Sequence, residues 1–279
     1  WVVSLERTGF SGKKLLIVYN MGAATAKKIT DRGIEIFAFN RDDEGNCTYP
    51  KKDDFSLMVE RFAHVWYFLT NSEELFDKVI MTDVRDVVFQ SDPFENEVMK
   101  AVWNEVVVGT ENIRLQDEPW GRDNMRHSFG PMIYETVKDN PIYCAGVIGG
   151  SRHHLADFCL NIYLMCMGAP KHVPGGGGPD QAAMNVMLSL QAYRTTTTKT
   201  AGSFVAHLGT SLPAVAAGSG GAGEIYKNNL DEYEKLLIWS EELKMEDDIV
   251  YKNGEKVDIL HQYDRIPVWD FIIQQKYRE

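Results

Sequence analysis

Two carboxylates at the end of an apolar segment are the side chains of this sequence best suited to chemistry. In the segment 79–94 (VIMTDVRDVVFQSDPF), Asp83 and Asp86 follow a run that predicts a buried strand. Ligands of open α/β sheets bind at the carboxyl ends of strands, and Mg2+ or Mn2+ prefers carboxylate oxygens together with substrate phosphates. The pair therefore predicts a divalent cation that binds a phosphorylated ligand. On local composition alone, such a pair is more often a set of solvated turn residues or helix caps.

The elements that would position these carboxylates alternate along the chain. Short apolar runs predict strands at 14–20, 34–39, 77–82, 105–109, 143–150 and 258–260. Helical spacing predicts helices at 23–31, 55–70 and 228–242, and a further helix is expected to begin after Pro179. Polar or small residues predict loops at 120–128, 173–179 and 214–223. This alternation favours an α/β architecture with a largely parallel sheet and a ligand site at the carboxyl ends of its strands.

Composition narrows the class of protein and the kinds of partner. The 279 residues are 44% hydrophobic, which suits a single globular domain over 1–279. A net charge of −11 without a long basic run argues against nucleic-acid binding, and no apolar run approaches the ~20 residues of a membrane span. The four cysteines are too few and too irregularly spaced for a disulfide framework or a CxxC-type zinc site, so we interpret them as packing residues. Because the chain starts at Trp1, it fits either a cytoplasmic protein or a trimmed, Golgi-type lumenal domain.

The acidic segment resembles a known motif. GT-A glycosyltransferases of the retaining, glycogenin-like families carry Asp-x-Asp after an apolar strand and before a "-PF" or "-PL" segment, and 79–94 is similar to it. The spacing here is Asp-x-x-Asp, from Asp83 to Asp86, and Arg85 between them is a candidate phosphate contact. The aspartyl phosphatase motif is a competing match, but Arg85 stands where its second Asp is required.

Two later segments are similar to donor and reaction-centre motifs of the same families. The segment 142–150 (IYCAGVIGG) resembles the "NAGV" strand that contacts the donor sugar, with Cys144 where Asn is usual. Taken alone, it would be a plain buried strand. The segment 178–187 (GPDQAAMNVM) resembles the "DQ...N" helix start, which implies a catalytic Asp180 and an acceptor-binding Gln181. The alternative role of Asp180 is a helix N-cap.

The last matching segment, 260–265 (LHQYDR), implies a third metal ligand. Many retaining GT-A enzymes use a late His for this purpose, and His261 has that place. The commoner role of a lone His is a satisfied core or surface residue. The resemblance also implies a set of donor-binding residues: Arg61, Thr82, Asp83, Arg85, Ala145, Gly146, Asp264 and Arg265.

Acceptor binding has weaker signals in the sequence. Trp120 and His153 are candidates because aromatic faces and polar side chains suit a sugar, although structural roles are commoner for single residues of these types. The four glycines at 175–178 could form a gate over the acceptor or a surface insertion.

Taken together, the motifs imply a GT-A fold: one Rossmann-like domain with a central mixed, mainly parallel sheet flanked by helices. Its nucleotide-binding part would cover about 1–110, and its acceptor-binding part about 111–279. The implied enzyme uses Mn2+ or Mg2+. Its expected donor is a UDP-sugar, with a GDP-sugar as the second choice, and its expected acceptor is a glycan or glycoconjugate. Retention of configuration is the preferred outcome. The alternatives are an inactive transferase-like binding domain and a metal-dependent nucleotide phosphohydrolase.

Overall fold

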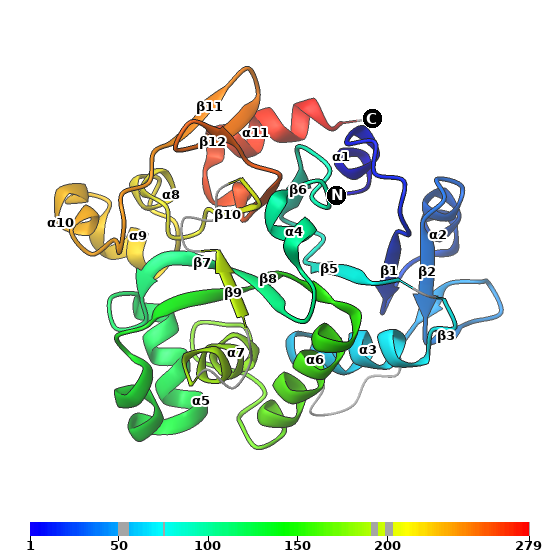
Figure 1. Ribbon diagram of the computed structural model, residues 1–279, viewed down its shortest axis with the longest axis horizontal. Helices are drawn as coiled ribbons and strands as arrows, with labels where there is room; N and C mark the ends of the chain where they lie inside the picture. Colours follow the sequence, from blue (N-terminus) through cyan, green and yellow to red (C-terminus); the bar gives the residue numbers. More distant parts are fainter. Residues whose placement is uncertain (50–55, 75, 191–194, 199–202, 279) are drawn as a thin grey trace.

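The computed structural model describes residues 1–49, 56–74, 76–190, 195–198 and 203–278, and it shows a mixed α/β fold (Figure 1). The described strands are β1 (Leu15–Val18), β2 (Glu35–Ala38), β3 (Asn40–Arg41), β4 (Cys47–Thr48), β5 (Lys78–Thr82), β6 (Val87–Phe89), β7 (Val106–Arg114), β8 (Pro141–Ser151), β9 (Thr195–Thr198), β10 (Val205–His207), β11 (Leu243–Glu246), β12 (Ile249–Lys252), β13 (Glu255–Lys256) and β14 (Ile259–His261).

The described helices are α1 (Val2–Arg7), α2 (Ala23–Thr30), α3 (Leu57–Asn71), α4 (Glu97–Ala101), α5 (Pro119–Val137), α6 (Arg152–Met167), α7 (Asp180–Ser189), α8 (Leu212–Ala216), α9 (Gly220–Tyr226), α10 (Leu230–Glu234) and α11 (Pro267–Lys276), with the 3-10 helix η1 (Tyr263–Arg265). None of these described helices has both the length and the apolar character needed to cross a bilayer.

The central sheet is mainly antiparallel, which corrects the expectation of a largely parallel one. Its described strands have the order β5-β8-β7-β9, and among them only the β7–β9 pairing is parallel. The strand β8 returns between β5 and β7 and runs opposite to both, a direction that a hydrophobic pattern does not encode. A second sheet has the order β10-β14-β6, with β10 parallel and β6 antiparallel to β14.

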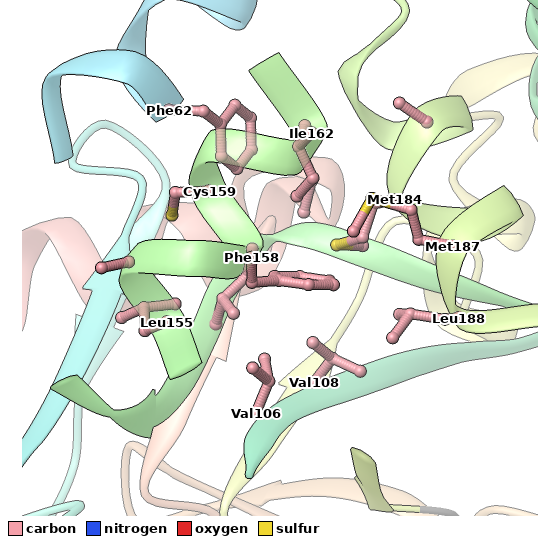
Figure 2. Close-up of a cluster of buried hydrophobic side chains, with 14 of the residues drawn as sticks. Phe62, Val106, Val108, Leu155, Phe158, Cys159, Ile162, Met184, Met187 and Leu188 are labelled. Carbon is pink, nitrogen blue, oxygen red and sulfur yellow. The ribbon is translucent and has the colours of Figure 1, made fainter. Parts of the chain in front are cut away.

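Helices α3, α5, α6 and α7 lie along one side of the central sheet (Figure 1). Figure 2 shows the core between them, where Phe158 and Ile162 of α6 lie among side chains of α3, α7 and β7. Both of these side chains are fully buried. Burying a side chain of this size contributes about 1.5–3 kcal/mol, so this layer fixes the sheet against the helices that carry polar site residues.

Most of the expected strands and helices form, but 120–128 is helical rather than a loop. The helix α5 starts at Pro119, which suits a first helical position because proline lacks an N–H. The Glu118 carboxylate caps it by accepting from the Trp120 N–H at 3.2 Å and from the Gly121 N–H. The expected start of α3 at Phe55 lies outside the described residues, and the helix is described from Leu57.

The C-terminal third differs from expectation in two places. The segment 214–223, expected to be irregular, contributes to α8 and α9. The helix expected at 228–242 is confined to α10 (Leu230–Glu234). Beyond it, Ile238 N–H donates to Asn112 C=O at 3.1 Å, and Trp239 N–H donates to the Asn112 side chain at 3.0 Å. These bonds, with the isolated bridge from Leu237 to Ile113, tie the segment to an irregular part of β7 where the local pattern favoured a helix.

Candidate metal and donor site

The acidic turn after β5 is held by backbone hydrogen bonds on both sides. Asp83 N–H donates to Gly146 C=O of β8 at 2.8 Å, and Gln262 N–H donates to Asp86 C=O at 2.8 Å. The strand β6, which follows the turn, pairs with β14 in a register that places Val87 opposite His261. This antiparallel pairing brings a residue almost 180 positions later in the chain beside the two carboxylates.

His261, Asp83 and Asp86 form a group of potential metal ligands. The Nε2 atom of His261 lies 3.7 Å from Asp83 Oδ2 and 3.8 Å from Asp86 Oδ1. These separations are too long for hydrogen bonds, yet a cation ~2.1 Å from each ligand atom can bridge them. The two carboxylate oxygens suit Mn2+ or Mg2+, and a histidine nitrogen is a common third metal ligand. The three ligand side chains therefore fit the expected cation.

The backbone leaves space for this arrangement at Gly146. A Cβ atom on Gly146 would overlap the His261 ring, including its Nε2 atom. His261 is only 2% exposed, so its ring has little freedom to move aside. Glycine at this position of β8 is therefore a condition for placing the imidazole next to the acidic turn.

Arg61 of α3 connects the acidic turn to the start of α7. Its guanidinium donates to Asp83 Oδ1 and, at 2.9 Å, to Asp180 Oδ2. Burial would lower the pKa of Arg61, but the charges of Asp83 and Asp180 hold it above its ordinary value. Burial would likewise raise the pKa of Asp83, but Arg61 and His261 lower it, so this carboxylate is ionised at neutral pH. Because Arg61 uses Oδ1, Asp83 keeps Oδ2 for a cation.

Asp180 and Gln181 lie at the start of α7. The N-cap of this helix is Pro179, and Asp180 is the first helical residue, so its carboxylate binds Arg61 and does not serve as the N-cap. Burial raises the pKa of Asp180, an effect that the charge of Arg61 opposes. Gln181 accepts from Ala145 N–H at 3.3 Å and donates to Glu111 Oε1 at 3.1 Å. The two side chains thus connect α7 to the acidic turn and to β8.

A cavity of about 1080 Å3 opens onto this group, and β1 and β5 contribute to its walls. Its volume suits a ligand as large as a nucleotide sugar. The predicted site residues in its lining are Arg61, Thr82, Asp83, Arg85, Asp86, Trp120, Ala145, Gly146, Asp180, Gln181, His261 and Arg265.

Two predicted residues are placed outside that lining. Asp264 lies behind Arg85 and Arg265, with Oδ2 at 3.2 Å and 3.6 Å from their guanidinium nitrogens, and so fixes these two cations. His153 is an exposed residue of α6. This helix follows the end of β8 that pairs with Lys78, whereas the acidic turn follows Thr82 at the other end of β5. The structure therefore does not bring His153 to the site.

Two functional candidates have no motif in the sequence. Glu111 and His207 are buried polar residues, 8% and 7% exposed, near the far side of His261. His207 ends a short apolar run, which is a weak signal because many strands end in a polar residue, and Glu111 lies in the middle of β7, where no local signal marks it. Only the pairing of distant strands makes them neighbours of the predicted ligands.

No model of a protein family and no curated protein matches this chain. What the site can do therefore follows from its side chains. A group with two carboxylates and an imidazole can hold a hard divalent cation, and Arg85 and Arg265 add positive charge at the same cavity. This combination fits a phosphorylated ligand of moderate size.

Proposed function

We propose that this chain is a metal-dependent glycosyltransferase of the GT-A type. It would transfer a sugar from a nucleotide diphosphate sugar to a hydroxyl group of a glycan or glycoconjugate. The observation that carries this proposal is the convergence of Asp83, Asp86 and His261 at a cavity of about 1080 Å3 whose lining includes Arg61 and Asp180. A UDP-sugar is the first choice of donor and a GDP-sugar the second, by the resemblance of the motifs.

The cation site supports a diphosphate leaving group. Asp83, Asp86 and His261 would hold Mn2+ or Mg2+, which when bound offsets the negative charge that develops as the bond from the sugar to the diphosphate breaks. Asp83 and Asp86 bring two carboxylates to the site, whose negative charge a divalent cation would offset. Arg85 is held by an ion pair with Asp264, and its side chain is 81% exposed. Its guanidinium can therefore also bind a phosphate in the cavity that it lines.

Asp180 is the proposed catalytic carboxylate. Glycosyl transfer passes through an oxocarbenium-like state, and a buried carboxylate can stabilise the positive charge at the anomeric carbon. Arg61 holds Asp180 on the wall of the cavity and at the same time holds Asp83. The new bond forms from the acceptor oxygen to the anomeric carbon, the electron pair of the old bond leaves with the diphosphate, and the acceptor proton is released. Retention of configuration is the preferred outcome.

Release of nucleotide diphosphate from a panel of UDP- and GDP-sugars tests this function without a known acceptor. We expect slow hydrolysis of one donor with Mn2+, none with chelator, and a loss of about 100-fold or more in Asp86→Asn and His261→Ala. Asp123→Asn is the matched control, because Asp123 pairs with Arg122 on the surface, outside the cavity.

Other outcomes would identify other functions. Metal-independent cleavage, or full activity of Asp86→Asn, would contradict the proposed metal site. Cleavage of sugar-free UDP to UMP would instead indicate a phosphohydrolase. Metal-dependent binding of a nucleotide sugar that is never turned over, even with an acceptor library, would indicate an inactive binding domain.

A further inference from the structure

The second ring nitrogen of His261, Nδ1, contacts side chains other than those of the acidic turn. This atom lies 2.9 Å from Nδ1 of His207 and 3.4 Å from Sγ of Cys144. The three side chains are buried, with exposed fractions of 1% for Cys144, 7% for His207 and 2% for His261. A thiol and two imidazoles therefore converge in the interior, next to the acidic group.

Three strands and one glycine create this cluster. The strands β10 and β14 pair in parallel with His207 opposite His261, and Cys144 is contributed by β8 of the central sheet. A Cβ atom on Gly109 of β7 would overlap the His207 ring, so glycine is needed at this position as well. The arrangement is consequently fixed by the backbone and does not depend on flexible surface side chains.

The three side chains hydrogen-bond to one another through Nδ1 of His261, but one buried polar atom of the cluster is left without a partner. His207 Nε2 is buried and has no hydrogen-bond partner among the described residues. Glu111, also buried, interacts with the Cys144 side chain and accepts from Gln181, and no ion pair of the described residues involves it. Burial, with a contribution from Glu118, raises the pKa of Glu111 to about 7. A buried carboxyl beside a thiol and two imidazoles would be stabilised by a cation.

We propose that Cys144, His207 and His261 bind a thiophilic divalent cation of the Zn2+ class. A thiolate and imidazoles are the ligands that Zn2+ prefers, whereas Mg2+ and Mn2+ prefer oxygen. Zinc lies about 2.3 Å from a thiolate sulfur and about 2.0 Å from an imidazole nitrogen, so the ligand atoms of a tetrahedral site are about 3.3–3.5 Å apart. The 3.4 Å between Cys144 Sγ and His261 Nδ1 matches this separation, and the two imidazoles, now 2.9 Å apart, would move slightly apart to admit the ion. The fourth position of the ion would be open to water or to Glu111, whose side chain interacts with that of Cys144. The Cys144 thiol loses its proton to solvent when the cation binds.

The cluster lies between two cavities. Cys144 and His261 line the main cavity, and His207 and Glu111 line a second cavity of about 220 Å3. This site uses Nδ1 of His261, while the acidic group uses Nε2. The inference therefore does not rest on the proposed transferase function, although both sites share one imidazole.

Titration of the metal-stripped full chain with Co2+, a spectroscopic substitute for Zn2+, tests the site. We expect one equivalent to give a near-ultraviolet thiolate-to-Co2+ charge-transfer band and the visible absorption of a tetrahedral centre, both removed by added Zn2+. Cys144→Ser should lose the thiolate band, and His207→Gln should weaken Zn2+ binding at least about tenfold. Cys47→Ser is the matched control, because Cys47 is an equally buried thiol on β4.

A double variant of the acidic pair distinguishes a failure of this inference from a failure of the transferase proposal. Asp83→Asn/Asp86→Asn should keep the thiolate band while losing Mn2+-dependent cleavage. The inference is overturned if the wild type binds Co2+ without a thiolate band, or if the band persists in Cys144→Ser. Because the wild-type spectrum alone can give the first of these results, the test does not depend on the folding of any variant.

Discussion

The two ring nitrogens of His261 lie in different groups of ligands, which we call the acidic face (Asp83 and Asp86, at Nε2) and the buried face (Cys144 and His207, at Nδ1). The two faces differ in the kind of ligand and in how the chain assembles them. At Nε2, two carboxylates from one turn face an open cavity. At Nδ1, a thiol and an imidazole from two different strands lie in the interior. In this chain one turn provides both carboxylates of the harder set, while the thiol and the second imidazole of the softer set come from two different strands. A single imidazole between them makes the two faces interdependent.

The largest stability effect is expected from the ion pairs at the edge of the acidic face. Arg61→Met leaves Asp83 and Asp180 without their cation, and the loss of one partner of a buried pair costs about 3–5 kcal/mol. Urea unfolding measures this loss. In Arg122→Met, which breaks an exposed pair with Asp123, the cost should stay below about 1 kcal/mol. Equal losses in the two variants would contradict the structural role of Arg61.

The two glycines distinguish the faces directly. Gly146→Ala and Gly109→Ala should each destabilise the chain by about 1–3 kcal/mol, because a methyl group would overlap His261 or His207. Gly146→Ala displaces the shared ring and should weaken both Mn2+ and Co2+ binding at least about tenfold, or 1.4 kcal/mol. Gly109→Ala should weaken Co2+ binding more than Mn2+ binding. If calorimetric titration shows the same loss of Mn2+ affinity in both variants, the two faces are not separable in this way.

Competition between cations sharpens the comparison further. An imidazole bound through Nδ1 retains a proton on Nε2, so an ion at the buried face should oppose Mn2+ at the acidic face. We expect Zn2+ to raise the Mn2+ dissociation constant about tenfold, equivalent to 1.4 kcal/mol of coupling. Electron paramagnetic resonance of free Mn2+ measures it. The same experiment on Cys144→Ser should show no such shift, and a shift that persists there would place Zn2+ at the acidic face instead.

The smallest effect is expected at a hydrogen bond that supports only the buried face. Thr210 Oγ1 donates to Glu111 C=O at 2.7 Å in the interior, and Thr210→Val should cost about 1 kcal/mol in thermal unfolding. Thr136→Val removes a similar bond to Met132 C=O on the surface of α5 and should change stability by less than about 0.5 kcal/mol. Mn2+ affinity should not change in Thr210→Val. A change would mean that the acidic face also depends on this bond.

Much of the candidate site could be predicted from the sequence because it is local. Asp83 and Asp86 directly follow the apolar run of β5, and Asp180 begins a helix whose acid in the first turn is visible in the sequence. His153 was chosen by residue type alone, and the structure places it at the opposite end of β8. Trp120, chosen in the same way, does line the cavity, so residue type alone does not tell the two apart.

The sequence by itself determined where apolar strands end in acid and where helices begin, since these depend on neighbouring residues. Only the tertiary structure decided the direction of β8 and the short length of α10, because pairing partners override local preference. The helix at 120–128 instead has local signals, a proline at its first position and the Glu118 cap. The group around His261, like the direction of β8, was decided by the tertiary structure. Its neighbours Cys144 and His207 come from strands 117 and 54 positions away, and hydrogen bonds between strands, not sequence spacing, bring them together.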